Sequence, residues 1–158
     1  MKLKFLVLVP LLIVLQGGAC SSDDDGGSIN DNYVTFLGIT NEATGGCNVE
    51  SQGGLDIICV YSGFYQLDGL SYGIGISHSG VCRTGTFNLR DDLDQPSDAF
   101  FVLQITDNGV VIDTYVGSSG TVDLSDSGTS TSMRFIGTVT NLETGEEEAI
   151  DGFMECPI

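Results

Sequence analysis

Hydrophobic and polar residues alternate along most of this chain, in short runs separated by turn-forming residues. Within residues 133–139, Met133, Phe135 and Val139 fall on one side, with an arginine and a threonine on the other. A period of two residues is typical of a β-strand with one buried face. Residues 99–106 are apolar on both sides, as in a strand at the centre of a sheet. Almost no segment has helical periodicity, so the pattern predicts an all-β chain.

Turn signals divide the chain into about ten short strands. Asn108 and Gly109 lie between two apolar runs and predict a hairpin, and residues 142–146 predict a second one. Short strands with frequent turns predict an antiparallel β-sandwich or a flattened barrel, in a single domain over residues 33–158. The predicted strands are 33–40, 47–50, 55–62, 71–78, 85–89, 99–106, 110–116, 121–124, 133–141 and 148–156.

The first 19 residues have the features of a secretory signal. Lys2 and Lys4 precede an apolar run over residues 5–15, and small residues follow up to Cys20. A charged start, a short apolar core and small residues before the cut define such a signal. The run is shorter than the roughly 20 apolar residues that a membrane-spanning helix requires.

Gly18, Ala19 and Cys20 resemble the small-small-Cys core of the bacterial lipoprotein signal. The resemblance implies that residues 1–19 are a lipoprotein signal peptide, removed on export, and that Cys20 carries the lipid. The family usually has leucine where this chain has Gly17. The alternative is an ordinary cleaved signal that leaves Cys20 as a spare thiol.

Residues 20–32 are small, acidic and rich in serine and glycine, which predicts a flexible acidic tether. Its first residues, Cys-Ser-Ser-Asp-Asp-Asp, resemble the start of lipoproteins from Bacteroidota. In that group, acids just after the lipidated cysteine mark export to the outer face of the outer membrane. The resemblance implies an outer-membrane lipid anchor on Cys20 and a domain facing the cell exterior. The alternative is a domain that faces the periplasm. More than one acyl chain would hold it stably.

The charge of the chain excludes one class of partner. Its formal net charge is −17, and loss of Lys2 and Lys4 with the signal would make it more acidic still. Such a chain repels nucleic acids and anionic lipid headgroups. Nucleic acid is therefore not a predicted partner.

Four cysteines follow Cys20, and an even number in an exported chain predicts two disulfides. Three pairings are possible. Cys47 and Cys59 flank a turn predicted at residues 51–54, which favours a bond between them and leaves Cys82 to pair with Cys156. The absence of Cys-x₂-Cys spacing makes zinc a poor alternative.

Short motifs in the C-terminal half resemble a loose group of small all-β lipoproteins from the same bacteria. They lie at residues 84–89, 119–124, 135–139 and 151–153, in the order Gly-Thr-Phe, Gly-Thr-Val, Gly-Thr and Gly-Phe. The group tends to have an aromatic residue where this chain has Val139. The resemblance covers roughly residues 83–156. It implies a fold and a location but no reaction, because the group has no settled activity.

Residues 91–98 contain the best candidate for a cation site. Asp92, Asp94 and Asp98 lie in one loop, where a turn could bring their oxygens together on Ca²⁺. The glycine and the distal glutamate of an EF-hand are missing, and the alternative is a solvated loop. No other cofactor is predicted. A second acidic run, at 146–148, is expected to be solvated or to guard a strand edge.

Four aromatic residues cluster between positions 61 and 72. Tyr61 and Tyr72 are expected to face inward from strands, whereas Phe64 and Tyr65 are expected to lie in an exposed loop. Exposed aromatic rings can stack on a sugar or anchor a protein partner, so Phe64 and Tyr65 are candidate ligand contacts. The alternative is a corner of the hydrophobic core.

No catalytic residue is predicted. His78 is the only histidine, and its neighbours Ser77 and Ser79 would point to the opposite face of a strand. The Gly-x-Ser-x-Gly motif of many serine hydrolases is missing. The spacing of the acidic residues singles out no pair for glycoside hydrolysis.

The sequence therefore favours a non-catalytic binding or structural β domain, held at the outer membrane by lipid on Cys20. A protein or a glycan is its expected partner, and no residue names the ligand. The alternative is a small metal-dependent or carboxylate-based hydrolase that acts on extracellular glycan or peptide.

Overall fold

The computed structural model describes residues 32–43, 48–52, 58–79, 82–91, 95 and 97–157. They form ten β-strands, which confirms the all-β class and the expected number of strands. Within these ranges, no helix is long and apolar enough to span a membrane. The strands are β1 (Tyr33–Phe36), β2 (Ile39–Glu42), β3 (Asn48–Gln52), β4 (Ile58–Leu67), β5 (Leu70–Ser79), β6 (Gly85–Leu89), β7 (Asp98–Asp107), β8 (Val110–Asp126), β9 (Ser130–Asn141) and β10 (Glu147–Pro157).

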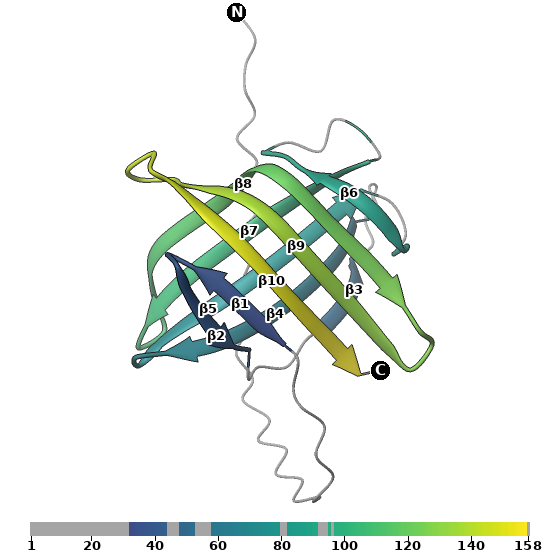
Figure 1. Cartoon of the computed structure of the whole chain (residues 1–158), viewed down its shortest axis with the longest axis horizontal. Helices are drawn as coiled ribbons and strands as arrows, with labels where there is room; N and C mark the ends of the chain where they lie inside the picture. The colour runs from purple at the N-terminus through teal and green to yellow at the C-terminus, as the bar shows by residue number, and fades with distance from the viewer. Residues whose placement is uncertain are drawn as a thin grey trace, which may run out of the picture.

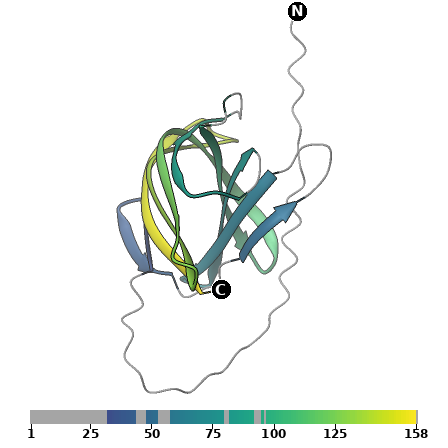
Figure 2. The same ribbon diagram turned by 90° about the vertical axis from the view of Figure 1, so that its right-hand side faces the viewer.

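All ten strands belong to one sheet, in the order β2-β1-β10-β9-β8-β6-β7-β5-β4-β3. The sheet curls until it is nearly closed into a barrel, with β8, β9 and β10 across the front of Figure 1 and β4, β5 and β7 behind them. Figure 2 shows the same curl from the side. Of the two predicted architectures, the structure therefore has the barrel, because a single sheet provides both walls.

The strand β8 has three neighbours. Its first half pairs with β7, and its second half pairs with β6 on one side and β9 on the other. The short strand β6 also pairs with the start of β7 in parallel, and the other neighbouring strands are antiparallel. The sequence predicted two strands, at 110–116 and 121–124, where the structure has one continuous strand.

Three two-residue turns join neighbouring strands, and both residues of each have positive φ. The predicted turn at Asn108 and Gly109 is confirmed, with φ of 49° and 81°. Asp68–Gly69 joins β4 to β5, and Leu37–Gly38 splits the predicted strand 33–40 into β1 and β2. Positive φ at both turn residues matches the right-handed twist of the flanking strands. The predicted hairpin at 142–146, which joins β9 to β10, is also confirmed.

Alternate residues of β1, β7 and most of β9 are buried in the barrel interior. Met133, Phe135 and Val139 are buried, as the alternation predicts. Phe135 packs against Phe101, with ring centroids 5.3 Å apart. A Cβ atom at Gly152 would overlap the Phe135 ring, so glycine is the residue that lets this ring lie against the backbone of β10. Burial of a phenylalanine side chain contributes about 1.5–3 kcal/mol.

In the described part of the chain, a disulfide joins Cys59 at the start of β4 to Cys82, with Cα atoms 4.9 Å apart. The favoured pairing of Cys47 with Cys59 and of Cys82 with Cys156 is therefore wrong. The strand register gives the reason, because Cys59 lies opposite Ser51 on β3. Cys47, and the side chain of Cys156, lie outside the described part of the structure.

The double variant Cys59→Ala/Cys82→Ala is expected to lose about 3 kcal/mol of unfolding free energy, because the bond joins residues 23 apart in sequence. Urea unfolding, monitored by circular dichroism, measures this loss. Peptide mapping without reductant should recover the Cys59 peptide joined to the Cys82 peptide. Recovery of Cys59 joined to any other cysteine would contradict the pairing.

Candidate functional site

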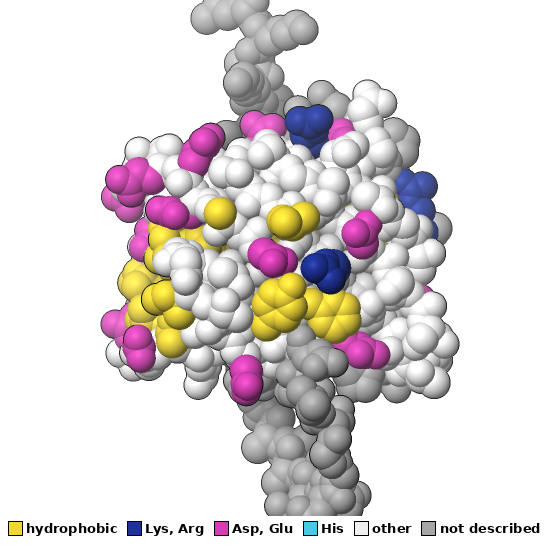
Figure 3. Space-filling model, viewed as in Figure 1, with side chains coloured by type: hydrophobic (Ala, Val, Ile, Leu, Met, Phe, Trp, Pro, Cys, Tyr) yellow, Lys and Arg dark blue, Asp and Glu magenta, His cyan; other side chains and the backbone are white. Residues whose placement is uncertain are grey.

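Three consecutive apolar residues are exposed where β8 begins. Val110, Val111 and Ile112 have 65%, 49% and 47% of their surface exposed. Figure 3 shows hydrophobic side chains gathered at the left of this face, near the start of β8. Single exposed apolar residues are ordinary, but a contiguous group on a folded domain marks an interaction surface.

A β-bulge explains why neighbouring residues are exposed together. On β7, Ile105 pairs with Asp113 and Thr106 pairs with Val111, so Ile112 is an extra residue in β8. A bulge breaks the strict in–out alternation of a strand. The bulge therefore interrupts the burial pattern at Ile112.

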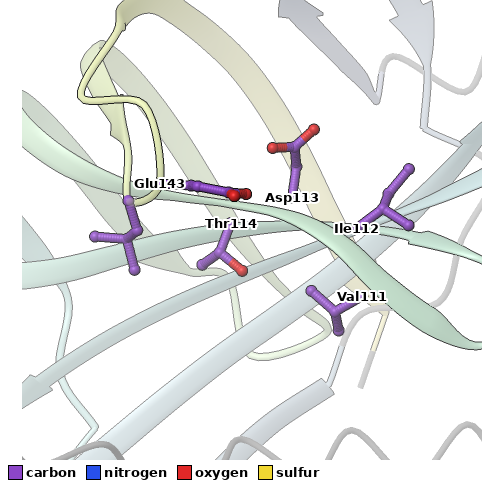
Figure 4. Close-up of a pocket in the computed structure, with 6 residues that line it drawn as sticks. Val111, Ile112, Asp113, Thr114 and Glu143 are labelled. Carbon is purple, nitrogen blue, oxygen red and sulfur yellow. The ribbon is translucent and has the colours of Figure 1, made fainter.

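Leu142 adds a fourth apolar side chain from the turn between β9 and β10, and 61% of its surface is exposed. A hollow of about 310 Å³ lies beside it. Figure 4 shows this site, with Asp113 and Thr114 on opposite sides of β8 and Glu143 contributed by the turn. We call it the β8 hollow; its lining residues are Val111, Ile112, Asp113, Thr114, Leu142 and Glu143.

The buried side chain of Asn141 ties the turn to β8. Its amide nitrogen donates to Asp113 Oδ1 at 2.9 Å, and its oxygen accepts from the backbone N–H groups of Glu143 and Thr144 at 2.8 and 3.0 Å. The Leu142 N–H also donates to the carbonyl of Thr114 at 2.9 Å. Hydrogen bonds of this kind contribute about 0.5–1.5 kcal/mol each, and more to a carboxylate. The hollow is therefore held in shape before anything binds.

The β1–β2 turn brings two more exposed apolar residues to this end of the barrel. Leu37 is 51% exposed and has a φ of 52°, a region that bulky residues rarely adopt, and Ile39 is 53% exposed. The preceding residue, Phe36, contacts the ring of Tyr115, which follows Thr114 of the hollow. The name apolar end is used below for Leu37, Ile39, Val110, Val111, Ile112 and Leu142.

Acidic residues surround the β8 hollow. Asp113 and Glu143 line it, and Asp107 of β7 pairs with Val110. Glu146 lies in the same β9–β10 connection as Leu142, and Glu147 begins β10. No arginine lines the hollow among the described residues. The local field therefore favours a positively charged partner.

A second hollow of about 310 Å³ lies near the other end of β8, where Gly85 pairs with Leu124. The Arg83 guanidinium lies over the Phe87 ring there, 5.3 Å from its centroid. The hollow is lined by Arg83, Thr84, Gly85, Thr86, Phe87 and Ser97, and Phe87, the only large apolar side chain in this set, is 3% exposed. The apolar end is therefore the better candidate for a binding surface.

The predicted ligand contacts Phe64 and Tyr65 do not lie in an exposed loop. The strand β4 runs through both positions, and its alternation places them on opposite faces. Tyr65 is fully buried and stacks on Tyr72 with centroids 4.6 Å apart, so the prediction for Tyr65 is wrong. Phe64 is 37% exposed on the outer face of β4. Tyr61 and Tyr72 are buried, as expected.

The structure describes one of the three predicted calcium ligands. Asp98 is buried, and its Oδ2 accepts a hydrogen bond from the Gln95 N–H at 3.0 Å. The Asp98 N–H donates in turn to the Gln95 carbonyl, so Asp98 closes the turn before β7. Asp92 and Asp94 lie outside the described residues, and a calcium site there stays a prediction. Elsewhere in the described part, no three His, Cys, Asp or Glu side chains are grouped to hold a metal.

His78 is a core residue near the end of β5. Its ring is fully buried and stacks on Phe87, with centroids 4.5 Å apart. Its Nδ1 donates to the Ser79 carbonyl at 3.1 Å, whereas no described residue hydrogen-bonds its Nε2. Burial lowers the pKa of His78; the Ser79 contact partly opposes this change, and Arg83 adds to it. A neutral imidazole is therefore favoured inside the barrel.

The lowered pKa of His78 predicts a pH-dependent stability. The unfolded chain takes up this proton near pH 6.5, before the folded protein does, so stability falls as the pH drops below about 6.5. Urea unfolding at pH 7.5, 6.5 and 5.5 measures the effect. The variant His78→Phe keeps an aromatic ring beside Phe87 and should lose this part of the pH dependence. Equal pH profiles for the two proteins would contradict the assignment.

Comparison with known proteins found no match among protein-family models, curated proteins or solved structures. The site therefore has to be interpreted from its own chemistry. The apolar end combines exposed aliphatic side chains with neighbouring carboxylates, so it can bind a partner that offers an apolar group and positive charge. Sequence reasoning missed it, although three apolar residues in a row after Asn108–Gly109 were a visible departure from alternation.

Proposed function

We propose that this protein is a lipid-anchored binding module of the outer membrane that faces the cell exterior and docks a protein partner through its apolar end. One observation carries the proposal. Val110, Val111 and Ile112 are exposed in succession beside a hollow that hydrogen bonds hold in shape. Removing apolar surface from water contributes about 25 cal/mol of favourable free energy per Å² buried.

The chemistry of the surface favours a protein over a glycan. Sugars are commonly held by the faces of aromatic rings. The described lining of the β8 hollow contains no aromatic residue: its apolar members are Val111, Ile112 and Leu142, and its polar members are Asp113, Thr114 and Glu143. Aliphatic side chains around a hollow suit an apolar anchor residue from a protein, with polar groups at the rim.

The lipid anchor is supported by the sequence before residue 32. A charged start, an apolar run and small residues lead to Cys20, and Asp23, Asp24 and Asp25 follow it. A thiol at this position would carry the diacylglyceryl group, and two or more chains give stable attachment.

The variant Cys20→Ser tests the anchor. Wild-type protein should take up radiolabelled palmitate and partition into the detergent phase, whereas Cys20→Ser should remain unlabelled and aqueous. Protease treatment of intact cells then distinguishes an exterior-facing domain from a periplasmic one. Equal labelling of the two proteins would exclude Cys20 as the lipidated residue.

The docking surface is tested by photo-crosslinking on intact cells. A photoreactive amino acid in place of Glu143, beside the hollow, is expected to give a discrete adduct with one partner. Adding Val111→Ser, Ile112→Thr and Leu142→Ser should reduce that adduct at least about tenfold, because these side chains form the hollow.

Ile136 provides the matched control. It is 58% exposed on β9 and does not line the hollow. The change Ile136→Ser should leave the adduct unchanged, and melting curves should show that every variant folds. An adduct that survives the triple change, or that Ile136→Ser removes equally, would contradict docking at the apolar end.

A further inference from the structure

We infer that the partner segment is a basic, extended peptide that adds to the barrel as a new β-strand beside Val110–Asp113. This inference rests on the proposed docking function and specifies its occupant. It follows from three features of the start of β8: an open strand edge, a hollow next to that edge, and negative charge around both.

The open edge arises because β8 extends beyond its partner. Pairing between β8 and β9 begins at Tyr115, opposite Asn141, and the Leu142 N–H donates a hydrogen bond to the carbonyl of Thr114. The chain then turns away into β10. In the described structure, residues 110–113 of β8 are therefore paired with β7 on one side and with no strand on the other.

The register shows which backbone groups face the open side. Asp107 and Val110 flank the two-residue turn, so they form the hydrogen-bonded pair of the β7–β8 hairpin. The N–H and C=O groups of Val111, the next residue, consequently point away from β7. An added strand would satisfy both, which is the main source of affinity when a peptide extends a sheet edge.

The β8 hollow provides the side-chain contact. Residues of an added strand alternate between the two faces of the sheet, about 3.3 Å apart along the strand. A strand beside Val111 and Ile112 would place an apolar residue next to Leu142. The residues on either side of that apolar residue would then face the acidic surroundings.

Charge selects among the possible occupants of the edge. Asp107, Asp113 and Glu143 surround it, and the whole chain carries −17. Two copies of this chain would bring these carboxylates together, which disfavours pairing between copies. A segment in which lysine or arginine alternates with valine or leucine would hydrogen-bond to the open edge of β8 and place its positive charges near these carboxylates.

Peptide binding at physiological salt tests the inference directly. The probe is a short peptide in which valine alternates with lysine. Its two controls are the same peptide with glutamate for lysine and the same peptide with N-methylated valine amides. Titration calorimetry on the folded protein gives Kd, and hydrogen exchange gives amide protection. The Lys–Val peptide should bind and protect the Val111 amide, whereas each control should bind at least about tenfold more weakly.

The matched variants separate this inference from the proposed function. Val111→Ser/Leu142→Ser should weaken the peptide at least about tenfold, and Ile136→Ser should leave its affinity unchanged. Failure of the Lys–Val peptide to bind, equal binding of either control peptide, or equal binding to all variants would overturn strand addition. If a partner docks at the apolar end without adding a strand, the peptide does not bind, but the crosslinked adduct from position 143 is still reduced by the changes at Val111, Ile112 and Leu142. Loss of that dependence would overturn the proposed function itself.

Discussion

The structure depends on the continuity of β8, which must pair with β7, β6 and β9 along its 17 residues. A flat strand of that length could not follow a curled sheet. Two bulges supply the bend, one at Ile112 and one at Ser118, where the register with β9 shifts. At the second, the Ser118 hydroxyl donates to the Thr138 carbonyl at 3.2 Å, which keeps the extra residue attached to β9. Curvature and closure of the barrel therefore follow from irregularities in one strand.

Glycine makes the second bend possible. Gly120 and Gly137 face each other across β8 and β9, and a Cβ atom on either would overlap the backbone of the other strand. Gly120 also has a φ of 124°, which L-residues with side chains rarely adopt. The two strands approach closely here, and the approach lets β8 turn from β7 towards β6. The site at the start of β8 is thus shaped by the same strand that shapes the whole barrel.

Sequence periodicity was sufficient for the fold class because alternation reports burial directly. It placed β6 at its observed bounds and identified the Asn108–Gly109 turn. It failed where glycine stays inside a strand. The predicted strand 55–62 ended just before Gly63, which put Tyr65 in a loop, but Gly63 is buried within β4. The opposite error occurred at Leu37, where a turn was missed. Leucine is not a turn-forming residue, and only the tertiary structure holds it at positive φ.

The candidate site was harder to predict for a physical reason. Three apolar residues in succession also fit a strand buried on both faces, and the sequence contains no information on where β9 ends relative to β8. The disulfide shows the same limit, because antiparallel pairing places Cys59 of β4 opposite His78 of β5, four residues before Cys82. Spacing along a chain does not give spacing in a barrel.

Asn32, the first residue that the structure describes, is fastened to β10. Its side chain donates to the Glu155 carbonyl at 3.2 Å and accepts from the Glu155 N–H at 2.7 Å, so the entry of the chain is fastened to β10. The strand β1 then leads from Asn32 towards Leu37 at the apolar end. A load applied through the preceding residues would thus act on the Asn32–β10 junction. The opposite end of β1, next to the exposed Leu37, lies away from that junction.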